Sequence, residues 1–279
     1  MTENPLLSIV IAVLNNAATL GRCIESVLAQ DYKNRELIVI DGGSTDGSLE
    51  IVREHASKLA YWESKPDRGV YHAFNKGLQK ASGEWIYFLG SDDYLWDRRV
   101  TDRMSIHLAG AYPTYRVVYS QICFVTPQGE TLEVLGRPWK ECRRWFRQGF
   151  MIPHQAVFHH RSLFDVHGPF NETFRLAGDY ELLLRELAKR EALFVPGIIV
   201  AAYQFGGSSS LPDNSLRVLR ERRLAHVLNG IRFPGFLWYA MIRTLIRIAL
   251  WKMLGERTTR RVLDWGRAVL GKPPFWTRI

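Results

Sequence analysis

The chain has 279 residues, of which 47% are hydrophobic, and a net charge of +9. This composition, without a low-complexity block or an internal repeat, indicates a globular protein with a sizeable core and excludes a disordered or fibrous chain. The three cysteines are odd in number and lack CxxC spacing, which favours a reduced, cytosolic chain. Because a basic segment is missing before the first apolar run, we expect no signal peptide.

The positive charge is concentrated at one end of the chain. Residues 230–279 contain ten Lys or Arg against two acidic residues, a net charge of +8. The first 229 residues carry 27 basic and 26 acidic side chains and are nearly neutral. An anionic partner surface is therefore expected at the C-terminal tail, and the chemistry in the neutral part.

The first 81 residues alternate between apolar runs typical of strands and amphipathic helical patterns. We predict strands at 7–13, 36–41 and 61–63, and helices from Thr19, at 49–59 and at 70–81. This alternation predicts a parallel sheet with right-handed crossovers. Gly42-Gly43 does not form a dinucleotide-binding fingerprint, because the acid Asp41 precedes the glycines and no GxGxxG follows the first strand. From spacing alone, Asp41 is either a turn residue or a ligand contact at a strand end.

A fourth apolar run, 85–90, predicts a strand buried on both faces, and it ends in Ser91-Asp92-Asp93. Ligand crevices of open α/β sheets lie beyond the carboxyl ends of the strands. Two adjacent carboxylates at this position favour a divalent metal ion. The alternative is that one of these acids caps the next helix.

These motifs occur in an order that resembles the nucleotide-sugar half of the family-2 glycosyltransferases of the GT-A fold. The residues that carry the resemblance are Ser8–Ile11 with Asn15, Asp41–Gly47, Asp67–Tyr71, Asn75–Gly77 and Gly83–Asp93. Bacterial enzymes of O-antigen, capsule and exopolysaccharide assembly are the most similar. The resemblance implies that Asp93 binds a divalent metal, Mg²⁺ or Mn²⁺, on the donor diphosphate. It also implies donor contacts from Asn15, Asp41, Asp67, Asn75, Lys76, Ser91 and Asp92, with Asp41 near the base and Asp92 near the ribose.

Residues 97–150 predict a helix at 98–108 and a hairpin of strands at 117–125 and 131–135. The following stretch, 137–147, is basic with interleaved aromatic residues. It fits a contact with nucleic acid, with a phosphorylated acceptor or with a membrane, and equally an amphipathic surface helix.

The stretch from Pro153-His154-Gln155 through Gly178-Asp179-Tyr180 resembles the acceptor half of the same enzymes. We predict a strand at 152–158, a short helix at 163–166 and a helix with Asp179 just inside its N-terminus. By resemblance, Asp179 is the catalytic base, while His154 and Gln155 line the site. From the residues alone, Asp179 fits a helix-stabilising acid and His154 a structural histidine. A strand at 198–203 precedes a loop, 205–210, that we expect to be mobile.

The segment 236–254 is long enough to span a bilayer, but Arg243, Arg247 and Lys252 interrupt it. Each would cost roughly 2.5–3.5 kcal/mol near the bilayer centre, more than the apolar residues recover. We therefore expect a helix lying on an anionic membrane surface, with Trp238, Tyr239 and Trp251 at the interface. A core helix or a homodimer helix is the alternative.

Taken together, these features predict an α/β fold, GT-A-like and Rossmann-type, with a mostly parallel central sheet flanked by helices and a basic helical tail. Residues 1–100 would form the nucleotide-sugar-binding half, 101–229 the acceptor half, and 230–279 the amphipathic tail. The resemblance implies a metal-dependent inverting enzyme, and the tail predicts a peripheral position at the inner face of the cytoplasmic membrane. It would move a sugar from a nucleotide sugar, with UDP-sugars favoured, to a saccharide or an undecaprenyl-diphosphate-linked acceptor.

Two other functions compete with this interpretation. A sugar-phosphate nucleotidyltransferase also uses metal-binding acids, but it requires a Gly-rich, basic loop after the first strand, where this chain has Leu14-Asn15-Asn16-Ala17. A protein that binds nucleic acid or another anionic surface without catalysis would explain the charge but not the buried acids. We therefore expect no nucleic-acid partner.

Overall fold

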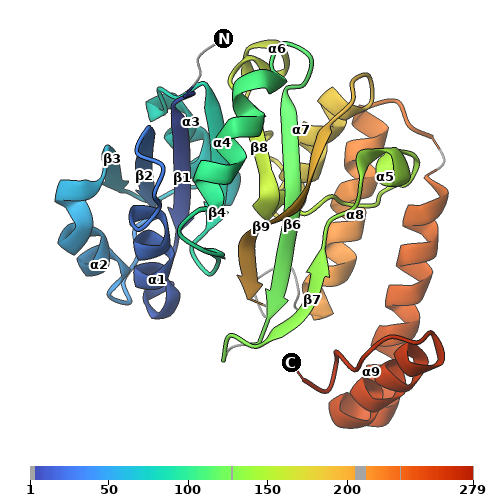
Figure 1. Cartoon of the computed structure of the whole chain (residues 1–279). Coiled ribbons are helices and arrows are strands. Elements are labelled where there is room, and N and C mark those ends of the chain that lie inside the picture. Colours follow the sequence, from blue (N-terminus) through green and yellow to red (C-terminus); the bar gives the residue numbers. More distant parts are fainter. Residues whose placement is uncertain (1–3, 127, 205–211, 233, 279) are drawn as a thin grey trace.

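The computed structural model describes residues 4–126, 128–204, 212–232 and 234–278, which form an α/β fold (Figure 1). Strands from both halves of the chain join one nine-stranded sheet in the order β3-β2-β1-β4-β8-β6-β9-β5, with β7 paired to β6. The predicted fold class is confirmed. The loop 205–210, which we expected to be mobile, lies outside the described residues.

The N-terminal half is the predicted parallel unit. Strands β3, β2, β1 and β4 all run parallel, with Val13 opposite Asp41 and Ala12 opposite Gly90 at the carboxyl ends. Their polar loops therefore open along one edge of the sheet. The elements are β1 (Leu7–Val13), α1 (Ala17–Leu28), β2 (Arg35–Asp41), α2 (Ser48–His55), β3 (Tyr61–Ser64), α3 (Val70–Lys80) and β4 (Trp85–Gly90).

The second half extends the sheet with mixed pairing. Strand β8 is antiparallel to β4 and β6, whereas β6 and β9 are parallel. The elements are β5 (Tyr94–Leu95), α4 (Val100–Ala111), β6 (Val117–Val125), β7 (Thr131–Leu135), α5 (Trp139–Phe146), β8 (Val157–His160), α6 (Ser162–His167), α7 (Gly178–Leu187) and β9 (Leu193–Gln204).

Two apolar layers pack on opposite faces of this sheet. One contains buried side chains of α1 and α4, such as Ile24 and Met104. The other contains buried side chains of α3, α5 and α7, such as Phe74, Phe146 and Leu183. The sheet is therefore covered on both faces, which explains why its central strands read as continuous apolar runs.

Three predicted boundaries were wrong. The predicted strand 152–158 begins only at Val157, because the Ala156 N–H bonds to the Pro153 carbonyl at 3.0 Å and closes a 3-10 turn over His154–Ala156. The predicted helix 49–59 ends at His55 and continues as a 3-10 turn over Ala56–Lys58. The strand predicted at 198–203 extends back to Leu193.

The basic stretch 137–147 forms the amphipathic surface helix that was one of its four interpretations. Trp139, Cys142 and Phe146 are buried on one face of α5, and the basic side chains lie on the other. The exposed Trp145 contacts Phe236, with ring centroids 6.1 Å apart. This surface is therefore continuous with the start of the C-terminal tail.

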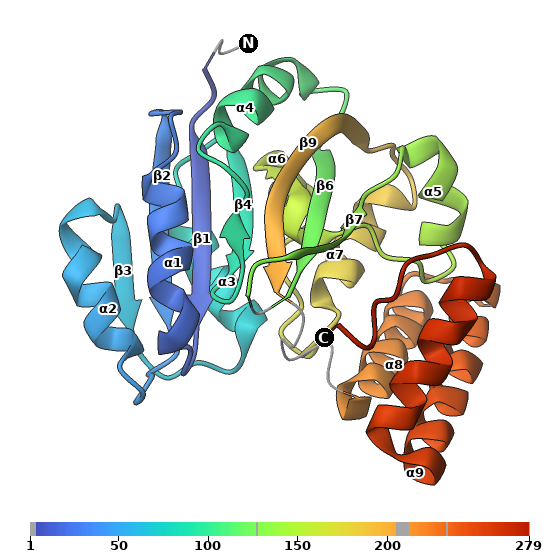
Figure 2. The ribbon, with the colours of Figure 1, turned by 60° about the horizontal axis from the view of Figure 1, so that its bottom comes forward.

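The tail forms the long helix α9 (Gly235–Val269), which lies beside α8 (Pro212–Leu228), the last helix before the tail, to one side of the sheet (Figure 2). Gly255 interrupts α9 with φ 74°. Asp264 then accepts hydrogen bonds from the backbone N–H groups of Phe275, Trp276 and Thr277 at 2.8–2.9 Å, which folds the C-terminal segment back. In the described parts of the chain, no helix has the length and apolarity needed to cross a membrane.

Candidate active site

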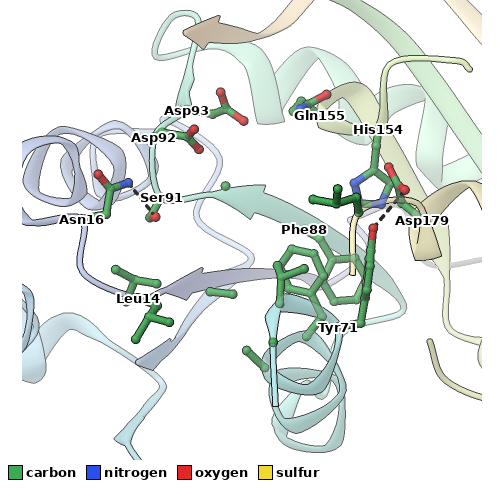
Figure 3. Close-up of a pocket in the computed structure, with 18 of the residues that line it drawn as sticks. Leu14, Asn16, Tyr71, Phe88, Ser91, Asp92, Asp93, His154, Gln155 and Asp179 are labelled. Carbon is green, nitrogen blue, oxygen red and sulfur yellow. Dashed lines mark hydrogen bonds between the residues drawn. The ribbon is translucent and has the colours of Figure 1, made fainter. Parts of the chain in front are cut away.

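A cavity of about 790 Å³ opens beyond the carboxyl ends of β1 and β4, where the parallel strands place their loops (Figure 3). It lies between the two halves of the chain, since residues of α3 and of the α7 N-terminus also line it. The polar side chains that line it are Asn15, Asn16, Thr19, Asp67, Tyr71, Ser91, Asp92, Asp93, His154, Gln155, Arg175, Asp179 and Tyr203.

The two adjacent acids sit on a turn directly after β4. The Asp93 N–H bonds to the Gly90 carbonyl at 3.1 Å, and the chain continues into the short strand β5. A Cβ at Gly90 would lie 2.8 Å from Asp92 Oδ1 and 3.0 Å from Asp93 Oδ2. Both carboxylates therefore converge above a residue that must lack a side chain. The helix-capping alternative is wrong, because the next helix begins only at Val100.

Asp93 is buried and Asp92 is half-buried. Asp93 is 2% exposed, and burial raises the pKa of the Asp92 carboxyl. Burial raises the pKa of Tyr87 well above its ordinary value, and the negative charge of Asp93 raises it further. A buried pair of carboxylates is favoured when a cation joins it.

The loop after β1 holds the acidic turn in place. The side chain of Asn16 donates to the Ser91 hydroxyl at 2.9 Å, and the Thr19 hydroxyl donates to the Ser91 carbonyl at 2.9 Å. Asn15 adopts a left-handed backbone conformation with φ 50° and accepts a hydrogen bond from the Thr45 N–H at 2.8 Å. The first and fourth strand ends therefore form one connected wall of the cavity.

Asp179 lies on the opposite wall, two residues after the N-cap of α7. Its Oδ1 accepts hydrogen bonds from the Tyr71 hydroxyl at 3.1 Å and from the Tyr180 N–H at 2.8 Å. Burial raises the pKa of Tyr71 well above its ordinary value, and the Asp179 charge raises it further, so the hydroxyl stays protonated and donates. A Cβ at Gly178 would lie 2.8 Å from the Tyr71 ring. The glycine before Asp179 thus allows this tyrosine to reach it.

His154 completes the wall beside Asp179 and packs against the rings of Phe74 and Phe88. Burial lowers the pKa of this histidine, and the Asp179 charge opposes that shift, so the imidazole is neutral near pH 7. Its Nε2 is buried and has no hydrogen-bond partner among the residues that the structure describes. A buried nitrogen of this kind can hydrogen-bond a ligand that enters the cavity.

Asp67 and Arg175 line the cavity next to α3. Asp67 Oδ1 accepts a hydrogen bond from the Gly69 N–H at 2.7 Å, and a Cβ at Gly42 would lie 2.5 Å from Asp67 Oδ2. The Arg175 guanidinium lies against Gly69. Among the described residues that line the cavity, Arg175 is the sole Lys or Arg, against the carboxylates of Asp67, Asp92, Asp93 and Asp179.

Three predicted donor contacts do not line the cavity. Asp41 is fully buried and accepts hydrogen bonds from Ser44 and Ser64. Asn75 bonds the Phe170 backbone in both directions, at 2.9 and 3.0 Å. Lys76 pairs with Glu63 at 3.0 Å. The structure gives these side chains protein partners. The other predicted site residues line one cavity: Asn15, Asp67, Ser91, Asp92, Asp93, His154, Gln155 and Asp179.

Sequence reasoning missed Asn16, Tyr71 and Arg175 as cavity residues. Tyr71 belongs to a motif that carried the resemblance, and an aromatic hydroxyl four residues before Asn75 was the available signal for it. Asn16 directly follows Asn15, which carried the resemblance. Arg175 lies in the segment before the helix of Asp179, and no role in the site was predicted for that segment.

The mostly parallel sheet flanked by helices, with the cavity at the carboxyl ends of its strands, is the GT-A fold of glycosyltransferases. The comparisons agree with this assignment. Residues 8–160 match the family model described as "Glycosyl transferase family 2". The chain belongs to this family and is a glycosyltransferase.

Relatives and solved structures support the family and the fold respectively. A PGL/p-HBAD biosynthesis glycosyltransferase of Mycobacterium tuberculosis is 32% identical over 211 residues, covering 74% of this chain and 80% of the relative. A mannosyltransferase of Pyrobaculum calidifontis, solved with GDP-Man and Mn²⁺, has a TM-score of 0.65 at 18% identity, covering 98% and 83% of the two chains. S. aureus TarS in complex with UDP-GlcNAc has a TM-score of 0.63 at 17% identity, covering 88% and 73%.

Proposed function

We propose that this protein is a metal-dependent, inverting glycosyltransferase. It moves a sugar from a nucleoside-diphosphate sugar to a hydroxyl of a saccharide or lipid-linked saccharide acceptor in cell-surface polysaccharide synthesis. The observation that carries the proposal is the cavity that joins Asp92 and Asp93 on one wall to Asp179 on the other. Such a cavity can bind a leaving group at one side and activate an acceptor at the other.

The residues present fit a divalent metal ion. Four carboxylates face one guanidinium in the lining, so a diphosphate would add negative charge to an already acidic cavity. Mg²⁺ is usually held by one or two carboxylates together with substrate phosphates and water. In the described residues, no group of three or more His, Cys, Asp and Glu is arranged to hold a metal unaided, which agrees with a site that the donor completes. Asp93 would hold the ion, and the bound ion would neutralise the departing diphosphate.

Asp179 acts as the general base. Its Oδ1 accepts both hydrogen bonds, from the Tyr71 hydroxyl and from the Tyr180 N–H. We assign to Oδ2 the uptake of the proton from the hydroxyl of the sugar acceptor. The acceptor oxygen bonds to the anomeric carbon while the bond from that carbon to the diphosphate oxygen breaks. The proton of the acceptor hydroxyl passes to Asp179. A single displacement of this kind inverts the anomeric configuration.

The donor lies along the wall made by Asn15, Asp67, Ser91 and Asp92, with Arg175 near its diphosphate. We favour a UDP-sugar. The proposed contacts of Asp41 with the base, and of Asn75 and Lys76 with the nucleotide, require these side chains to exchange their present protein partners.

Donor binding is tested by thermal unfolding of the full chain with UDP-, GDP- and dTDP-sugars, each with and without Mn²⁺ or Mg²⁺. We expect a nucleotide sugar to raise the Tm in the presence of the metal and much less in its absence, because a ligand that binds only the folded state stabilises it. The same panel with EDTA is the control. A chain whose Tm responds to no nucleotide sugar would contradict the proposal.

The acceptor would be reached at a membrane. One face of α9 exposes an apolar stripe that includes Trp238, Ile242, Leu245 and Ile246, each 47–58% exposed. Leu237 and Thr244 are buried on the opposite face. Arg243 and Lys252 are exposed near this stripe, whereas Arg247 turns inward to the Ser215 hydroxyl at 2.7 Å. An apolar stripe with basic neighbours fits the anionic cytoplasmic leaflet, where an undecaprenyl-diphosphate-linked acceptor would lie.

Binding to membranes is tested with Ile242→Ser, Leu245→Ser and Ile246→Ser combined. Each side chain contributes about 1 kcal/mol when it enters the bilayer interface, so we expect vesicle affinity to fall on the order of 100-fold. The measurement is sedimentation with vesicles of anionic phospholipid. Ile106→Ser with Val166→Ser, which also alters exposed apolar residues, is the matched control. Equal binding by the tail variant and the wild type would exclude this role of α9.

A further inference from the structure

One carboxylate of α8 holds the segment that leads into α7. Glu221 Oε2 accepts hydrogen bonds from three successive backbone N–H groups, those of Arg175 at 3.0 Å, Leu176 at 2.8 Å and Ala177 at 3.0 Å. Successive N–H groups that point to one place form an anion-binding concavity. Hydrogen bonds to an ionised acceptor are roughly twice as strong as neutral ones. The segment 175–177 is therefore anchored at a single oxygen.

The anchored segment supplies one charged residue of the cavity lining and leads to a second. Arg175 lines the cavity with its guanidinium against Gly69. Ala177 is the N-cap of α7, so the backbone that Glu221 fixes leads directly to Asp179. A displacement of this segment would move both side chains relative to Asp92 and Asp93, which stand on a different element.

Helix α8 holds α7 at a second place as well. Arg222 donates to the Gly149 carbonyl at 3.1 Å and lies 5.6 Å from the centre of the Tyr180 ring. The Tyr180 hydroxyl lies 3.0 Å from His226 Nε2. The residue that follows Asp179 is therefore fixed from the same helix that anchors the segment before it, although none of the described α8 residues lines the cavity.

We propose that Glu221 is a positioning residue that sets the place of Asp179 and Arg175 in the active site, without touching substrate. The proposal rests on the proposed function, because it takes Asp179 as the base. It gives α8 a role in catalysis, and it joins this helix to the catalytic centre through one carboxylate.

The test uses Glu221→Ala and Glu221→Gln in the full chain, with Glu36→Ala as the matched control. Glu36 also accepts several hydrogen bonds, from Ser8, Ser82 and Gly83, but it stands at the opposite end of the sheet. Two quantities are measured: amide hydrogen exchange, and the rate at which nucleoside diphosphate is released from a nucleotide sugar that raises the Tm.

In Glu221→Ala we expect faster exchange at the amides of 175–177 and a fall in kcat of about 100-fold, the cost of a misplaced catalytic group, with the donor-induced rise in Tm retained. Glu221→Gln keeps an acceptor oxygen and should stay within about tenfold of wild type. Glu36→Ala should speed exchange at Ser82 and Gly83 only and leave kcat within about threefold.

Unchanged exchange at 175–177, or an unchanged kcat in Glu221→Ala, would overturn the positioning role. An equal loss of kcat in Glu36→Ala would overturn it too, since the effect would then reflect general destabilisation. If the wild-type chain itself releases no nucleoside diphosphate, the proposed function fails, and the exchange measurement still decides whether Glu221 anchors the segment.

Discussion

Asp179→Asn is expected to lower the rate of sugar transfer by a factor of at least 10²–10⁴, the usual contribution of a general base. Asparagine keeps the size of the side chain, and its amide oxygen can still accept the hydrogen bonds from Tyr71 and Tyr180. It cannot take a proton from an acceptor hydroxyl. The fold and the donor-induced rise in Tm should therefore remain while kcat is lost.

The control for Asp179→Asn is Asp102→Asn, which removes an acid from the first turn of α4. Both acids favour a helix N-terminus by about 0.3–1 kcal/mol, so the two variants should lose similar stability. Only the Asp179 variant should lose turnover. Turnover within a few-fold of wild type in Asp179→Asn would show that another group accepts the proton.

Most of the fold was predictable because the sheet is buried on both faces. The runs 7–13 and 85–90 carry no charge and, apart from Ser8, no strongly polar residue, and the structure makes them β1 and β4 with the predicted bounds. The start of β8 was not predictable from apolar residues, because the turn at Pro153 keeps Ile152 and His154 out of the ladder while both remain buried. An apolar run predicts that its residues are buried, but it does not predict that they pair with a neighbouring strand.

The limits of the site prediction have a similar cause. Asp92 and Asp93 could be predicted to lie at the cavity because they follow a buried strand, and Asp179 because its motif resembles a known family. Asn75 and Lys76 were predicted from the same motifs, but the structure pairs them with Phe170 and Glu63. Glu221 was not predictable, since its partners are backbone N–H groups more than 40 residues away. A hydrogen bond to a backbone N–H does not require a particular residue type at the partner position, so it leaves no motif in the sequence.

Asp93→Asn is expected to abolish the metal dependence of donor binding. The change removes one negative charge from a side chain that is 2% exposed, and it preserves the volume of that side chain. Substituting a residue that only supports a metal ligand commonly costs 10–100-fold in metal affinity, so replacing a direct ligand should cost at least about 100-fold. The measurement is a titration of Mn²⁺ against the donor-induced rise in Tm.

Comparing Asp93→Asn with two other variants separates the roles of the acids. Asp92→Asn should weaken donor binding less, since we assign Asp92 to the ribose. Asp179→Asn should leave the Mn²⁺ titration unchanged, because Asp179 stands on the opposite wall with its Oδ1 held by Tyr71. An unaltered titration in Asp93→Asn would rule out Asp93 as the ligand. Loss of the metal response in Asp179→Asn would instead mean that the two walls share the cation, and base and ligand could then not be assigned to separate carboxylates.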